Sequence, residues 1–355
     1  MPKRIAAIDI LKALAIIAVI LIHTTSVSFN YVKLASIQNL LIFDQFLRFS
    51  VPLFVATSGY LLAIKYLNQN LKLSEFFQKR ALKLLPSYLV WTAIIYIYLH
   101  YFTHEPQQHY SLFEIIFLGR ADYHLYFVPM LFQLYLLFPV ILYLYKKNRA
   151  ATILGTLIIQ LSVIAFSLAI RNQTIKVNFL WGDQQQYLFC LTWVFYFTLG
   201  ILIFDLKNKE RFKKLPLITL GLTLAGFYAA VSQSITIFTK THQLIDATTF
   251  TRYPIVLFAS GAISSVLLFG EKLESLFEPV KNFFAAIGKS SYTIYLMHTI
   301  VLRIVYNKLF IGENHPNLWL FPVLVVTISV LTSLLITYTT KIITNQLAFL
   351  KPRFH

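Results

Sequence analysis

Ten apolar stretches of about 20 residues each run through this chain of 355 residues. An α-helix needs about that length of apolar sequence to cross a bilayer, so these stretches constrain the fold more than any other feature. They lie near residues 8–28, 41–64, 82–103, 124–145, 150–170, 187–206, 215–234, 253–270, 290–309 and 319–341. The runs are continuous rather than alternating, and lipid offers the backbone no hydrogen-bond partners, which favours helices over strands. The sequence predicts an all-α integral membrane protein, a bundle of about ten transmembrane helices in one polytopic domain over residues 1–355.

The charge pattern agrees with a membrane protein. Only 13% of the residues are charged and 57% are hydrophobic, whereas a soluble domain carries about 25% charged residues. The net charge of +17 does not indicate nucleic-acid binding, because Lys and Arg gather in short connections, as in cytoplasmic loops of membrane proteins. One alternating set of connections holds 21 of them and the opposite set holds 7. This bias predicts that both the N- and the C-terminus are cytoplasmic and that the lipid bilayer is the main partner.

The first span carries three ionisable residues, Asp9, Lys12 and His23. Such residues are costly within a membrane and by default have a partner or a function. Lys12 and His23 are 11 positions apart, which places them about 20° apart on one helix face and about 16 Å apart along the axis. Asp9 lies about 60° from Lys12 on the same face. We expect this face to contact protein or water; in the alternatives, Lys12 snorkels to the inner surface beside Asp9, and His23 is an ordinary buried histidine.

Further polar residues lie in and after the second span. Arg48 falls in its outer third, and Ser58-Gly59 near its other end permits close helix packing. Beyond this span, Arg80 and Lys83 are one helical turn apart, a spacing suited to phosphate oxygens. A plain cluster of cytoplasmic positive charge is the alternative.

Together with two later motifs, these residues resemble the bacterial membrane-bound acyltransferase type 3 family along essentially the whole chain. The family's first helix carries a basic residue, ten intervening residues and a histidine, which Lys12 and His23 match. Its second helix carries an aromatic-rich stretch that ends in Ser-Gly-Tyr or Ser-Gly-Phe, matched at Phe54–Tyr60.

The remaining family motifs also have counterparts, with two departures. The Arg-x-x-Arg motif reads Arg80 and Lys83 here, and lysine lacks the bidentate fork of arginine. The His-Leu-Trp-Phe-Leu-type opening of the fourth helix has tyrosine in place of tryptophan in His124–Val128. The late Gly-x-x-Ser-Tyr-x-x-Tyr-Leu-x-His motif matches Gly288–His298. The chain is most similar to the compact subgroup, without a fused soluble domain, that acts on cell-surface glycans.

The resemblance implies an enzyme, an O-acyltransferase of the bacterial cytoplasmic membrane. It would move an acyl group, most often acetyl, from cytoplasmic acyl-CoA to a hydroxyl of a cell-surface or lipid-linked glycan. The alternative is an exporter of a polysaccharide or lipid-linked sugar, with the polar path serving permeation. The sequence leaves open the acceptor, the acyl chain and the oligomeric state.

Under the enzyme interpretation, His23 is the general base, Arg48 stabilises an oxyanion or positions the acceptor, and Asp9 orients or neutralises Lys12. Donor phosphates would bind Lys12, Arg80 and Lys83. The candidates for lining the substrate cavity are Ser58, Tyr60, His124, Tyr295 and His298. No metal is expected, and the single cysteine, Cys190, rules out an intramolecular disulfide.

Overall fold

The computed structural model describes residues 6–32, 34–103, 110–172, 174, 185–207, 215–310 and 320–350. It is 86% helix, and these residues include no strand, so the predicted all-α class is confirmed. The chain forms two compact units: a central unit, Lys33–Glu271, and a terminal unit, Met1–Val32 with Lys272–His355.

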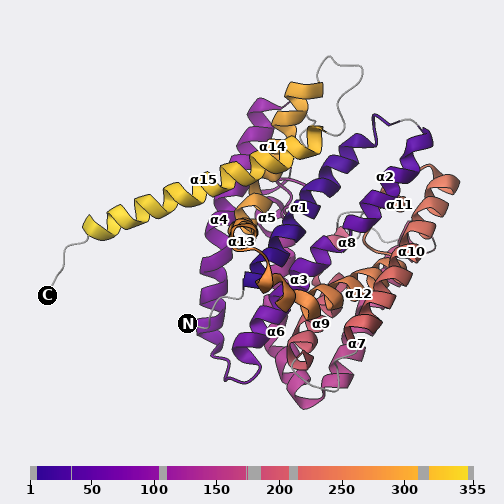
Figure 1. Ribbon diagram of the computed structural model, residues 1–355, viewed down its shortest axis with the longest axis horizontal. Coiled ribbons are helices and arrows are strands. Elements are labelled where there is room, and N and C mark those ends of the chain that lie inside the picture. Colours follow the sequence, from indigo (N-terminus) through magenta and orange to yellow (C-terminus); the bar gives the residue numbers. More distant parts are fainter. Residues whose placement is uncertain are drawn as a thin grey trace. The chain divides into compact units, whose positions relative to one another are not determined.

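The central unit contains most of the helices, and the colours of Figure 1 follow their order in the chain. They are α2 (Leu34–Leu47), α3 (Ser50–Tyr66), α4 (Leu73–Phe102), α5 (Leu112–Phe117), α6 (Phe127–Lys147), α7 (Arg149–Arg171), α8 (Gln185–Leu188), the 3-10 turn η1 (Cys190–Thr192), α9 (Val194–Leu206), α10 (Leu215–Thr241), α11 (Leu244–Ala247) and α12 (Tyr253–Phe269). The terminal unit contains α1 (Ala6–Ser28), α13 (Glu278–Lys289), α14 (Ser291–Phe310) and α15 (Leu320–Leu350). The 3-10 turn η3 (Gly270–Ser275) crosses the boundary of the two units in the chain.

Seven helical segments of the described residues are long and apolar enough to cross a membrane. They are Ala6–Ser28, Ser36–Tyr66, Leu73–Phe102, Phe127–Lys147, Arg149–Arg171, Leu215–Thr241 and Leu320–Thr340. The helices α9 and α12 are apolar but have only 13 and 17 residues. A multi-pass membrane protein is therefore supported, while the count of about ten spans and the cytoplasmic termini stay predictions.

Two predicted spans are interrupted. The span 41–64 lies within the single membrane-crossing segment Ser36–Tyr66, but two turn residues, Arg48 and Phe49, separate α2 from α3 inside it. Pro52 explains the break, because its ring clashes with the carbonyl of Arg48 four residues earlier and it has no N–H to donate. The predicted helix 187–206 is wrong in its first part, since regular helix begins only at Val194.

Side chains satisfy the backbone where this second break occurs. The Gln133 amide donates to the carbonyl of Leu188 (3.1 Å) and accepts from the backbone N–H of Cys190 (3.2 Å). Gln160 of α7 accepts from the N–H of Phe195 in the first turn of α9 (3.0 Å). Lipid cannot supply these hydrogen bonds, so the irregular segment depends on the two glutamines.

Helix backbones touch where glycines face a neighbouring helix. A Cβ placed on Gly59 of α3 would collide with the carbonyl oxygen of Phe197 on α9. A Cβ on Gly200 of α9 would collide in the same way with the carbonyl oxygen of Ala56 on α3. The close packing predicted from Ser58-Gly59 is therefore confirmed, and it joins α3 and α9 of the central unit.

Replacing Gly59 by alanine should lower the thermal unfolding midpoint of the purified protein, because α3 and α9 must move apart. Overpacking of this kind costs about 1–3 kcal/mol. Gly155→Ala in α7 is the matched control, since a Cβ there meets no atom within 4 Å, and its midpoint should be unchanged or slightly higher. Equal midpoints for the two variants, measured by scanning fluorimetry in detergent, would contradict the α3–α9 contact.

Candidate functional site

Two predicted site histidines meet in the terminal unit. The ring of His23 on α1 lies 5.2 Å from the ring of His298 on α14, with the ring planes tilted by 34°. The same number of residues after each histidine in the chain, the hydroxyls of Tyr31 and Tyr306 are 2.6 Å apart. This equal spacing means that α1 and α14 run parallel with the two histidines at one level. The hydrogen bond with Tyr306 raises the pKa of Tyr31, which lies beyond the end of α1.

The tautomer of His298 follows from its backbone contact. Its Nδ1 lies 2.7 Å from the carbonyl oxygen of Tyr295, and a carbonyl can only accept, so Nδ1 carries the proton in the neutral ring. The Nε2 atom of that ring then carries the lone pair. His298 is fully buried, whereas His23 is only partly buried. Of the two histidines, His23 is therefore the more exposed.

The other ionisable residues of α1 form an ion pair. Asp9 Oδ1 lies 3.5 Å from Lys12 Nζ; the Asp9 side chain is buried, and the Lys12 side chain is 23% exposed. A Cβ on Gly288 of α13 would collide with the carbonyl oxygen of Asp9, so α13 packs directly on the backbone here. The predicted pairing of Asp9 with Lys12 is thus present, and it leaves the lysine partly accessible.

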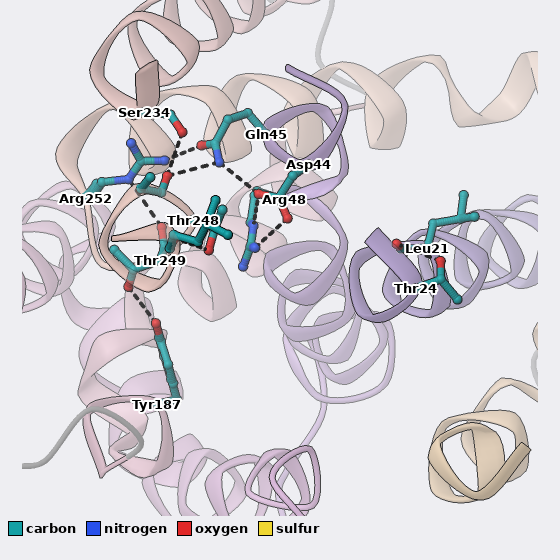
Figure 2. Close-up of polar contacts among 12 residues, drawn as sticks. Leu21, Thr24, Asp44, Gln45, Arg48, Tyr187, Ser234, Thr248, Thr249 and Arg252 are labelled. Atoms are coloured by element: carbon teal, nitrogen blue, oxygen red, sulfur yellow. Dashed lines mark hydrogen bonds and ion pairs between the residues drawn. The ribbon is translucent and has the colours of Figure 1, made fainter. Parts of the chain in front are cut away.

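The central unit contains a buried network around Arg48 (Figure 2). Asp44 accepts from Arg48 through both carboxylate oxygens, at 2.9 Å from Nε and 2.6 Å from Nη2. The Gln45 amide donates to Asp44 at 2.9 Å and accepts from Arg252. Arg252 also donates to two backbone carbonyls, those of Thr249 at 3.3 Å and Ala230 at 3.4 Å. All four side chains are buried, with Arg252 only 1% exposed.

The short helix α11 and the irregular backbone that follows it fold back into this part of the central unit. The carbonyl of Ala247 accepts from Ser234 on α10 (2.7 Å) and from Gln45 on α2 (3.4 Å). Two residues later, Thr249 shares a hydrogen bond with the Tyr187 hydroxyl (2.5 Å) (Figure 2). At membrane depth, irregular backbone is tolerated only where it is buried in protein or lines a cavity. The network around Arg48 is therefore a candidate binding region.

A second re-entrant segment carries His124. The Tyr88 hydroxyl of α4 donates to the carbonyl of Ile116 (2.8 Å), although α4 continues to Phe102, about 21 Å further along its axis. The chain after α4 therefore folds back along that helix. His124 Nδ1 lies 3.4 Å from Asp122 Oδ2, and both residues are buried.

The predicted phosphate-binding pair lies on α4. The guanidinium carbon of Arg80 is 5.8 Å from the centre of the Tyr135 ring, and Tyr135 also interacts with Ser58 of α3. The Nε atom of Arg80 is buried and has no hydrogen-bond partner among the described residues. Lys83 is exposed one turn further on. Tyr60 is buried against Phe204 of α9, with ring centres 5.5 Å apart.

The family model described as an acyltransferase domain matches residues 5–338. The chain belongs to the acyltransferase 3 family. The match includes every predicted site residue, in both units. A search of the curated proteins and a search of the solved structures each gave no match. The family supports a membrane acyltransferase, while the donor, the acceptor and the roles of individual residues stay predictions.

Sequence reasoning missed three members of the polar clusters of this acyltransferase. Asp44 had a usable signal, because it precedes Arg48 by one helical turn, the spacing of an i,i+4 ion pair. Asp122 lies two residues before His124, which is a weaker signal. Arg252 had none, because it reaches Gln45 from 207 residues away in the chain.

Replacing Asp44 by alanine should destabilise the acyltransferase strongly, by about 3–5 kcal/mol, because it leaves two buried guanidinium groups without a carboxylate. Glu75→Ala is the matched control: Glu75 also pairs with a cation one turn away, Lys79, but both side chains are half exposed. Its thermal midpoint should stay close to wild type. Similar midpoints for the two variants would show that the Asp44 pair is not desolvated.

Proposed function

We propose that this acyltransferase moves an acyl group, acetyl above all, from acyl-CoA to a hydroxyl of a cell-surface or lipid-linked glycan in the bacterial cytoplasmic membrane. The observation that carries the proposal is the contact of His23 with His298 in a chain of the acyltransferase 3 family. A neutral imidazole can take a proton near pH 7, which acyl transfer to a hydroxyl requires.

In the proposed reaction, His23 acts as the general base. It removes the proton of the acceptor hydroxyl while that oxygen attacks the thioester carbonyl. As the new ester bond forms and the C–S bond breaks, the proton passes from His23 to the departing thiolate of CoA. His298 is a positioning residue: its Nδ1–H is held by the Tyr295 carbonyl, and its ring packs against His23.

The donor is proposed to bind through its phosphates. Arg80 has no carboxylate partner among the described residues, and its buried Nε lacks an acceptor. A phosphate oxygen would supply that acceptor in a charge-assisted hydrogen bond. Lys83, exposed on the same helix, adds positive charge for the same ligand. Lys12, partly exposed beside Asp9 in the terminal unit, stays a predicted donor-binding residue.

Arg48 is proposed to position the acceptor. Asp44 occupies its Nε and Nη2 atoms, which fixes the orientation of the guanidinium plane. The Nη1 atom remains available, since it donates to none of the described residues. A held guanidinium of this kind can bind an oxygen of the acceptor without rearranging.

Replacing His23 by alanine should lower acyl transfer by about 10²- to 10⁴-fold, because the general base is lost. The measurement is transfer of radiolabelled acetyl from acetyl-CoA to glycan in membranes with equal amounts of protein. His100→Ala, which removes an exposed histidine on α4, should keep the wild-type rate. Full activity in His23→Ala together with loss of activity in His124→Ala would contradict the assignment of His23 as the general base and would favour the Asp122–His124 pair instead.

Replacing Arg80 by glutamine should raise the KM for acyl-CoA about tenfold or more and change kcat little. A lost charge-assisted hydrogen bond costs about 1.5–3 kcal/mol, which corresponds to that factor. Lys79→Gln is the control, because Lys79 is an exposed neighbour already paired with Glu75. An equal rise in both variants would indicate only general attraction of anions to this surface.

The second candidate function is export of a polysaccharide or lipid-linked sugar. The segments that fold back around His124 and after α11 support this alternative, since broken helices are common in transporters. The two functions differ in cells that lack the protein. An enzyme leaves the glycan on the surface without its acyl group, whereas an exporter leaves the glycan inside the cell.

A further inference from the structure

The network around Arg48 contains more positive than negative charge. It holds two guanidinium groups, Arg48 and Arg252, and one carboxylate, Asp44, which is bound bidentately by Arg48. The three acceptors of Arg252 are all neutral: the Gln45 amide and the carbonyls of Thr249 and Ala230. Arg252 is therefore a fully buried cation with no counter-ion of its own among the described residues, an arrangement that is costly in a low-dielectric interior.

No other carboxylate of the central unit whose side chain is described has Arg252 as its partner. These carboxylates pair with other basic residues, in the pairs Glu75–Lys79, Glu114–Arg120, Asp122–His124, Asp205–Arg149 and Asp246–Arg171. Asp246, the nearest of them in the chain, is 3.2 Å from Arg171. The missing negative charge is thus most simply supplied by a ligand.

We infer that the Arg48–Arg252 network binds an oxyanion, a carboxylate or phosphate group carried by the acceptor. This inference deepens the proposed function, because the identification of the ligand as a glycan rests on that function. The charge imbalance, which calls for an anion, does not depend on the proposed function.

Two features give the anion a way in and a binding surface. Arg48 is 8% exposed and its Nη1 atom has no acceptor among the described residues. Its guanidinium carbon lies 4.6 Å from the centre of the Phe250 ring, and that ring is 6.2 Å from the half-buried ring of Tyr187. Aromatic rings around a few fixed polar groups are typical of small-molecule sites. They suit a sugar ring whose acidic group reaches the arginines.

The site is recessed rather than superficial. Arg252 bonds to Ala230 of α10, and α10 continues to Thr241, about 16 Å further along its axis. Water screens charges weakly at such depth, so an arginine pair discriminates strongly between acidic and neutral sugars.

The test uses the full chain purified in nanodiscs of zwitterionic lipid, with the thermal midpoint followed at constant ionic strength. Three probes are compared: glucuronate, glucose 1-phosphate and neutral glucose. The acidic sugars should raise the midpoint by about a few degrees in a saturable way, because a ligand bound only to the folded state stabilises it. Glucose should have no effect. Absence of a response to both acidic sugars would overturn the inference.

Variants separate binding from a structural role. Arg252→Gln should weaken the apparent affinity for the acidic sugars at least tenfold, while Arg252→Lys, which keeps the charge, should stay within about threefold of wild type. Arg149→Gln removes an arginine that already pairs with Asp205, and it should bind as wild type does. If Arg252→Gln does not fold, Arg252→Lys decides: an undiminished acidic-sugar response supports the site, and a lost one in a folded protein contradicts it.

Two further arms identify the source of the anion and separate this inference from the proposed function. Nanodiscs with phosphatidylglycerol should not replace the sugar effect; if they raise the midpoint and abolish the sugar response, the ligand is a lipid headgroup and the sugar assignment fails. His23→Ala should keep the acidic-sugar response while losing acyl transfer. A wild-type protein that binds acidic sugars but never transfers an acyl group would refute the proposed function and leave the anion site standing.

Discussion

The bilayer offers neither hydrogen bonds nor a high dielectric, and the rest of the structure depends on this constraint. Every backbone group and every charge at membrane depth must find its partner within the protein. Helices satisfy most of the backbone by themselves. Where the helix is broken, side chains take over, as Gln133 and Gln160 do around the start of α9. The breaks are therefore held in one conformation, which is what a binding site requires.

Because of the same constraint, each buried charge needs a partner of opposite charge. Asp44 engages Arg48 through two hydrogen bonds, and Gln45 links that pair to Arg252. A neutral amide can connect two cations geometrically, but it cannot cancel their charge. Among the described residues the network is thus well fixed in structure and incomplete in charge, and this combination is the reason for proposing an anion site rather than an ion pair that only stabilises the fold.

In the terminal unit the polar groups are proposed to serve a different chemistry. The contact of His23 with His298 places two imidazoles side by side, and the Tyr295 carbonyl fixes the tautomer of the buried one. Lys12, which pairs with Asp9, lies on the same helix as His23, about 16 Å from it along the axis. A single helix therefore carries both the proposed base and a partly exposed cation, and its rigidity sets the distance between them.

The sequence by itself determined the class of the protein, the helical nature of its apolar runs, the shared face of Lys12 and His23, and the family. These properties depend on local composition and on the helical period, which a chain carries wherever it folds. It did not determine the break at Arg48–Phe49 or the irregular start of the span 187–206, although Pro52 was a signal for the first. Only the tertiary structure decided that His298 is the neighbour of His23 and that Arg252 joins Gln45 from 207 residues away. Such partners depend on how the helices pack and on which polar groups lipid leaves without a hydrogen bond. The spacing of residues along one helix predicts neither of these.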